Sequence, residues 1–176
     1  MNPDSLTQRR TMNETTAMPQ ELPQDTAGPG LLGLAERGLV IREVALRPDG
    51  TLDADSLAAE IGPRTRLVAM GLASNALGTV NDVALARELT RAVGAWLLLD
   101  AVHYAPQFAV DGAALDADFL LCSAYKFYGP HIGLLYCRPG LLDTLPTDRL
   151  CTQDPAGPFR IETGTLNHAA LVGVGA

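Results

Sequence analysis

The sequence predicts an α/β fold with a mainly parallel sheet and flanking helices. Three observations support this prediction: short apolar runs recur along the chain, stretches of helical periodicity separate them, and Gly, Pro or Asp residues mark the boundaries. At 176 residues the chain suits one domain with its own core. Residues 1–30 are polar and show no sustained period, so we interpret them as a flexible tail before a folded part at 31–176.

The first predicted elements lie between residues 39 and 71. Residues 39–46, LVIREVAL, alternate between apolar and polar side chains, which is typical of a strand. Residues 53–61 form a short helix that Asp53 caps and that ends before Gly62 and Pro63. Residues 66–71, RLVAMG, form the next strand.

The remaining elements complete a strand–helix alternation. A helix at about 82–93 carries apolar residues on one face, with Asn81 as its expected cap and Gly94 as its stop. Residues 96–100 and 119–123 are short apolar runs, as expected for strands that are covered on both faces.

Composition excludes several classes of partner. The net charge of −7 argues against a nucleic-acid surface and against an anionic membrane surface. No apolar run approaches the roughly 20 residues that span a bilayer. The N-terminus lacks the apolar core of a secretory signal, and three cysteines without a CxxC pair favour the cytoplasm. The three histidines have no metal-ligand spacing, so we expect no metal site.

Polar side chains follow three of the predicted strands. In open α/β sheets, ligands bind outside the carboxyl ends of the strands, so these side chains are candidates for one shared site. The candidates are Asn75 after 66–71, Asp100 and His103 after 96–99, and Ser123, Tyr125 and Lys126 after 119–122.

Lys126 is the only lysine in the chain, because the other 12 of the 13 basic residues are arginine. A lysine amine can lose its proton and attack a carbonyl, whereas a guanidinium stays charged. Burial against Phe127 and the neighbouring strands would favour the neutral, nucleophilic amine. The alternative is an ordinary surface lysine at a turn.

The neighbours of Lys126 match the needs of pyridoxal phosphate (PLP): a lysine for the aldehyde, an acid for the pyridinium nitrogen and donors for the phosphate. Asp100 is the candidate acid, and its alternative role is to cap a helix at 101–105. Ser123 and Tyr125 are candidate phosphate ligands, and their alternatives are a strand-end hydroxyl and a core aromatic.

Four motifs, SNALGTVNDV, LLLDAVHYAPQFAVD, DFLLCSAYKFYGPHIGLLY and IETGTLNH, occur in an order and spacing that resemble the class V (fold type I) PLP-dependent aminotransferases. The nearest resemblance is to the cysteine desulfurase-like proteins, and it covers about residues 31–176. It implies that Lys126 holds PLP as a Schiff base and acts as the proton-transfer base. It also implies that Asp100 pairs with the pyridinium nitrogen, as part of a PLP-binding large domain.

The resemblance assigns roles to the other candidates. Asn75 matches an amide that touches the cofactor or the substrate carboxylate, and Ser123 matches a phosphate ligand. His103 stands where many relatives have a glutamine near the phenolic oxygen. Tyr125 stands where many desulfurases have a histidine, which weakens its phosphate role. Thr165 matches a residue that reaches the partner subunit's phosphate, which implies a homodimer.

The resemblance implies an amino-acid substrate but leaves the reaction open. Cysteine desulfuration is the leading expectation, followed by transamination, lyase or epimerase chemistry. None of the cysteines matches the family's sulfur acceptor: Cys122 and Cys137 are expected in the core, and only Cys151 is expected to be accessible. We expect a partial large domain without the small C-terminal domain. Two alternatives therefore stay open: an active enzyme, or an inactive truncated remnant or binding module.

A serine hydrolase is the remote alternative, because Ser123 and Lys126 fit S-x-x-K, in which the lysine activates the serine. That motif opens a helix, whereas Gly129 and Pro130 follow here at once and would break one. The companion motifs of this class are also missing from their expected places.

Overall fold

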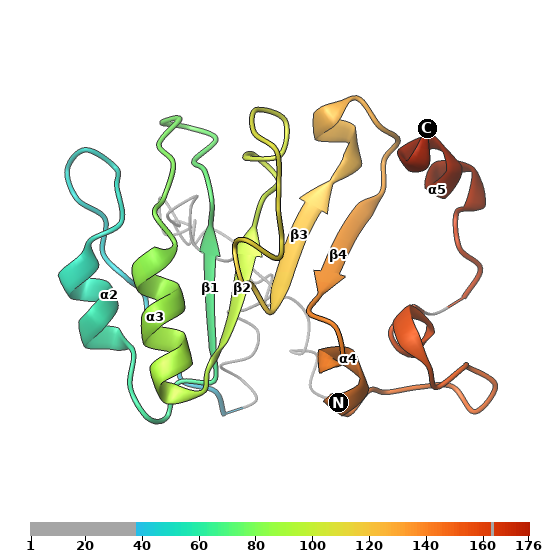
Figure 1. Ribbon diagram of the computed structural model, residues 1–176, viewed down its shortest axis with the longest axis horizontal. Coiled ribbons are helices and arrows are strands. Elements are labelled where there is room, and N and C mark those ends of the chain that lie inside the picture. Colours follow the sequence, from blue (N-terminus) through green and yellow to red (C-terminus); the bar gives the residue numbers. More distant parts are fainter. Residues whose placement is uncertain (1–37, 163) are drawn as a thin grey trace, which may run out of the picture.

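The structure is a computed structural model that describes residues 38–162 and 164–176. It contains a four-stranded sheet in the order β1-β2-β3-β4 (Figure 1). The strands are β1 (Leu67–Gly71), β2 (Trp96–Asp100), β3 (Phe119–Ser123) and β4 (Gly133–Cys137). The first three are parallel and β4 is antiparallel to β3, which confirms the predicted α/β class with a mainly parallel sheet. The tail expected at 1–30 lies outside the described residues.

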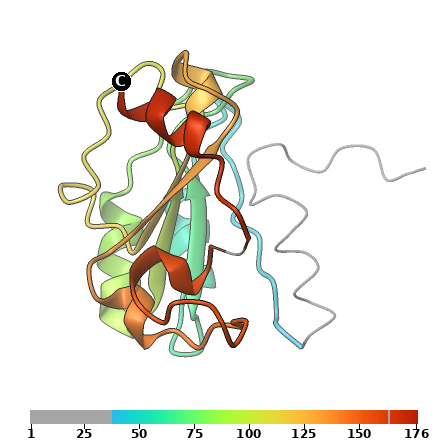
Figure 2. The same cartoon turned by 90° about the vertical axis from the view of Figure 1, so that its right-hand side faces the viewer.

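Helices flank this sheet and extend the chain beyond it. They are α2 (Ala54–Glu60), α3 (Ala84–Val93), α4 (Leu141–Thr144) and α5 (His168–Gly175), with 3-10 helices η2 (Ala124–Phe127) and η3 (Gly157–Arg160). Helix α3 packs on one face of the sheet, and η2 continues directly from the upper end of β3 (Figures 1 and 2). No described helix is both long enough and apolar enough to cross a membrane.

The caps of α2 and α3 have identifiable causes. Asp53 caps α2 as predicted, because its Oδ1 accepts a hydrogen bond from the Ser56 N–H at 2.8 Å. The predicted cap at Asn81 is wrong: its side-chain amide instead donates to the Gly71 carbonyl at 2.9 Å. Asp82 accepts from the Ala84 N–H at 2.8 Å. Gly94 ends α3 in the left-handed conformation (φ 69°), as predicted.

The strand predicted at 39–46 does not form. Within the described residues this segment makes one isolated bridge, between Leu46 and Leu52, and joins no ladder of the sheet. Ala45 donates its N–H to the Ser56 hydroxyl at 2.9 Å and accepts at its carbonyl from Asp53 at 3.0 Å. Those bonds tie the segment to the start of α2, so its alternating pattern is not used for pairing.

The core lies between α3 and the sheet. Leu97 and Leu99 of β2 are fully buried on one face, whereas Leu98, on the opposite face, is only partly buried. The expectation that the short strands are covered on both faces therefore holds for one face alone. The buried apolar cluster comprises Leu57, Met70, Leu72, Ala86, Leu97, Leu99, Ala101, Ala117 and Leu120.

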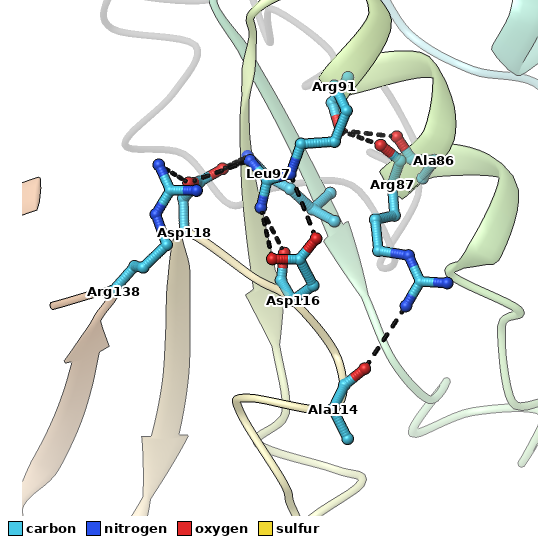
Figure 3. Close-up of polar contacts among 9 residues, drawn as sticks. Ala86, Arg87, Arg91, Leu97, Ala114, Asp116, Asp118 and Arg138 are labelled. Atoms are coloured by element: carbon cyan, nitrogen blue, oxygen red, sulfur yellow. Dashed lines mark hydrogen bonds and ion pairs between the residues drawn. The ribbon is translucent and has the colours of Figure 1, made fainter.

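A fully buried carboxylate, Asp118, ties four elements together at the start of β3 (Figure 3). Its Oδ2 accepts from the Leu97 N–H of β2 at 2.8 Å and lies 3.1 Å from Arg91 of α3. Its Oδ1 lies 2.9 Å from Arg138, which follows β4. A buried charge is costly unless it is paired and hydrogen-bonded, and these three donors satisfy that need.

Asp116 provides a solvent-exposed comparison, because Arg91 also contacts its carboxylate at 2.9 Å. The hydrogen bond from Arg91 is the main reason that the pKa of Asp116 lies below its usual value. Such a carboxylate stabilises the fold above the pKa of its unfolded form, and this contribution is lost as pH falls through the lowered folded value.

Asp118→Ala should lower the free energy of unfolding by about 2–4 kcal/mol, because the buried Leu97 N–H loses its acceptor and two arginines lose their shared carboxylate. Urea unfolding measures this change. The control Asp116→Asn should cost less than about 1 kcal/mol, since an exposed ion pair contributes little and asparagine tolerates the left-handed backbone at this position (φ 48°). Equal losses in the two variants would contradict the central role of Asp118.

Candidate functional site

The carboxyl ends of β1, β2 and β3 lie along one edge of the sheet, at the top of Figure 1. Gly71 pairs with Asp100 across β1 and β2, and Asp100 pairs with Leu121 across β2 and β3. The segments that carry Asn75, Asp100 and Ser123 therefore leave the sheet at the same edge. We call this edge the carboxyl rim.

Asp100 ends β2 with its main chain bonded on both sides. Its carbonyl accepts from Leu72 at 2.9 Å, and the next residue, Ala101, donates to the Leu121 carbonyl at 2.8 Å. Its Oδ1 accepts from the Val102 N–H at 2.8 Å. The side chain therefore caps a turn, whereas the alternative role predicted from the sequence was to cap a helix at 101–105. Asp100 itself is exposed.

The charge of Asp100 acts on Cys122, one residue before the end of β3. The pKa of the Cys122 thiol is raised mainly by burial and further by the Asp100 carboxylate. Burial alone raises the pKa of Cys137. Cys151 is exposed, as the sequence predicted, whereas Cys122 and Cys137, which were expected in the core, are only partly buried.

Asn75 is exposed at the tip of a compact turn after β1. The buried Ser74 organises this turn: its hydroxyl accepts from the N–H groups of Ala76 and Leu77, and its own N–H donates to Thr79. The bond from Asn81 to Gly71 closes the loop against the strand. The Asn81 Oδ1 is buried and has no donor among the described residues.

Lys126 lies in the loop of residues 124–132 that joins β3 to β4, and it is partly buried. The Ala124 N–H donates to the Ile132 carbonyl at 3.0 Å and closes the base of the loop. Gly129 donates to the Ala124 carbonyl at 2.9 Å, and a Cβ at Gly129 would lie 3.0 Å from the Cβ of Ala124. A side chain at position 129 would therefore be crowded by Ala124, which favours glycine at this close approach.

Tyr125 is half-exposed and stacks on His131, with ring centroids 4.8 Å apart and an interplanar angle of 12°. The Nζ of Lys126 lies over the same tyrosine ring, 5.3 Å from its centroid. Nothing in the spacing of the sequence marks a contact between His131 and Tyr125.

His103 and Thr165 are less closely tied to this loop. His103 is partly buried in the turn after β2, and Thr165 is exposed in the segment before α5. Neither side chain hydrogen bonds to a described residue. Helix α5 does approach the loop, because a Cβ on Gly173 would lie 3.6 Å from the Pro130 side chain.

The serine-hydrolase alternative finds little support in this geometry. Ser123 precedes a four-residue 3-10 helix that ends at Tyr128 in the left-handed conformation (φ 68°), whereas the S-x-x-K motif opens a longer helix. Across residues 38–162 and 164–176, no three His, Cys, Asp or Glu side chains gather as metal ligands.

Comparisons with known proteins agree on one family. The family model "Aminotransferase class-V" matches residues 32–176. A cysteine desulfurase of Salmonella typhimurium is 40% identical over 157 residues, covering 81% of this chain and 39% of the relative. The cysteine desulfurase CsdA from Escherichia coli has a TM-score of 0.72 at 29% identity, over 82% of this chain and 39% of that structure. An apo cysteine desulfurase from Thermococcus onnurineus has a TM-score of 0.71 at 30% identity. The chain thus spans about two fifths of the length of these relatives.

The charge of Asp100 gives a testable effect on cysteine reactivity. Asp100→Asn should speed the alkylation of Cys122 by iodoacetamide about two- to three-fold, because removing the carboxylate lowers the thiol pKa and thiolate is the nucleophile. Peptide mapping by mass spectrometry follows the rate at each cysteine. Cys137 is the internal control, and an equal change there would mean that the variant loosens the whole sheet.

Proposed function

The chain belongs to the class V aminotransferase family, and we propose that it holds PLP on Lys126 and uses this cofactor on an amino acid. The position of Lys126 is the observation that carries the proposal. The only lysine of the chain lies in a closed loop at the carboxyl rim, where α/β sheets bind ligands. Its relatives include proteins described as cysteine desulfurases.

The residues at the rim fit this cofactor. Asp100 uses Oδ1 for the Val102 N–H, and its Oδ2 has no donor among the described residues, so it is free to accept from a pyridinium nitrogen. The Ser123 hydroxyl makes no hydrogen bond within the described chain and can donate to a phosphate oxygen. An exposed carboxylate, a partly buried amine and a free hydroxyl therefore meet the three needs of PLP.

PLP supplies an electron sink for the bond that breaks at the substrate's α or β carbon. The chain's own residues supply orientation and proton transfer. Asp100 keeps the ring nitrogen protonated, and the Lys126 Nζ takes and returns the proton at the substrate carbon. We assign His103 to contact with the cofactor, Asn75 to the cofactor or the substrate carboxylate, and Ser123 and Tyr125 to the phosphate.

Cysteine desulfuration is the leading reaction, because the similar curated proteins carry that name. Two of the three cysteines do not fit the role of sulfur acceptor. The pKa values of Cys122 and Cys137 are raised, which disfavours the thiolate. Cys151 is exposed but lies outside the rim segments, so transamination, lyase or epimerase chemistry stays the second choice.

A second candidate function is cofactor binding without turnover. The exposure of Asp100 favours it, because a hydrated carboxylate binds the pyridinium nitrogen less strongly than one shielded from water. A homodimer would change this environment. We propose such a dimer in the cytoplasm, with the exposed Thr165 directed to the phosphate of the partner subunit.

The purified chain, incubated with PLP and reduced with borohydride, should gain one adduct on Lys126. Intact mass and peptide mapping detect it cleanly, since the N-terminal amine is the single competing group in a chain with one lysine. Lys126→Ala should abolish the adduct, and the matched control Lys126→Arg should also abolish it while keeping the positive charge.

Variants of Asp100 separate binding from chemistry. Asp100→Asn should keep the adduct but weaken PLP retention during dialysis, because the pyridinium nitrogen loses its charged partner. An adduct confined to the N-terminal amine of the folded, unsubstituted chain, with none on Lys126, would overturn the assignment of Lys126.

A further inference from the structure

The loop of residues 124–132 contains an aromatic pair, Tyr125 and His131, whose stacking plays no part in the proposed function. Tyr125 and His131 stand at opposite ends of the loop, next to the hydrogen bond between Ala124 and Ile132 that closes its base. Their stack is nearly parallel, with an interplanar angle of 12°. The two ends of the loop are therefore joined twice: by the main-chain hydrogen bond and by the stacked side chains.

The same tyrosine ring contacts the lysine. The Lys126 Nζ lies 5.3 Å from the ring centroid, within the range of a cation–π interaction. An ammonium in such a contact is drawn to the ring face and explores fewer positions than one on a free side chain. The place of the amine thus depends on where the ring of Tyr125 is held.

The neighbourhood of the ring makes His131 the residue that holds it. Tyr125 is 45% exposed and its hydroxyl has no hydrogen-bond partner among the described residues, so neither full burial nor a polar anchor fixes the ring. Tyr128, two residues beyond Lys126, is fully exposed and contributes no cover. Among the described residues, His131 is the aromatic side chain that stacks on Tyr125.

We propose that His131 is a positioning residue for Lys126: by stacking on Tyr125 it holds the aromatic face over which the lysine amine rests. Tyr125 then serves as a platform for the amine before any cofactor binds. The meaning for catalysis rests on the proposed function, because an amine already held near one place loses less freedom when it bonds to an aldehyde.

The geometry itself is testable without PLP. Reductive methylation with ¹³C-formaldehyde places two labelled methyl groups on Lys126 and on the N-terminal amine, and it keeps the positive charge. In ¹H–¹³C correlation spectra, methyl groups over an aromatic ring shift upfield. The Lys126 signal is assigned by its loss in Lys126→Arg, and we expect it upfield of the value for an unfolded chain in urea.

Four variants then test the role of His131. Tyr125→Leu should remove the upfield shift, and His131→Ala should remove most of it. His131→Phe, which keeps a ring for stacking, should restore it. His168→Ala, at an exposed histidine that begins α5, should leave it unchanged.

The outcomes separate this inference from the proposed function. An unchanged shift in His131→Ala overturns the positioning role, even if PLP still forms its adduct on Lys126. An unchanged shift in Tyr125→Leu overturns the platform itself. A shift that responds as expected in a chain that forms no PLP adduct would support the inference and overturn the proposed function. Circular dichroism of each variant identifies any that fail to fold. If His131→Ala is one of them, the amide spectrum of residues 124–132 in His131→Phe decides whether a ring at position 131 keeps the loop in place.

Discussion

The register of the sheet depends on one buried carboxylate. The Asp118 carboxylate accepts a hydrogen bond from the Leu97 N–H, and the Asp118 N–H donates to the Leu97 carbonyl. These two bonds fix the register in which β2 and β3 pair. A shift of one residue would turn every side chain of a strand to the opposite face. Arg91 and Arg138 then bring α3 and the end of β4 to the same point. The position of Asp100, at the far end of β2 and beside Leu121 in the middle of β3, follows from this anchor.

The carboxyl rim combines rigid supports with accessible side chains. Ser74 organises the turn that presents Asn75, and the Asp100 main chain is hydrogen-bonded to both neighbouring segments. The hydrogen bond between Ala124 and Ile132 closes the loop of residues 124–132, which we call the lysine loop. Each candidate side chain therefore extends from backbone that other residues hold. Binding sites on well-supported backbone lose less conformational freedom when a ligand arrives. The arrangement supports a cofactor site, which agrees with family membership and with the single lysine.

The sequence revealed the elements whose causes are local. β2 and β3 are short leucine-rich runs with clear ends, and α2 begins at a strong capping residue, so their limits were predictable. The strand predicted at 39–46 was wrong, because alternation shows which side chains a strand could bury and does not show whether a neighbouring strand is present to pair with it. Asn81 and Asp82 are equally good caps by residue type, and only the nearby Gly71 carbonyl decides between them. The roles of Asp118 and His131 arise from contacts that no spacing along the chain encodes.

The return of the chain from β3 to β4 through the lysine loop also bears on how the protein folds. This hairpin joins strands that are near neighbours in sequence, whereas β1 must pair with β2 across the whole of α3. Contacts between close neighbours close small loops and form quickly, while pairing across a crossover helix waits for a larger loss of chain entropy. The hairpin can therefore form early and offer its free β3 edge to β2. On this order of events, the lysine loop takes shape before Asp100 arrives beside it, and the parallel half of the sheet completes the rim last.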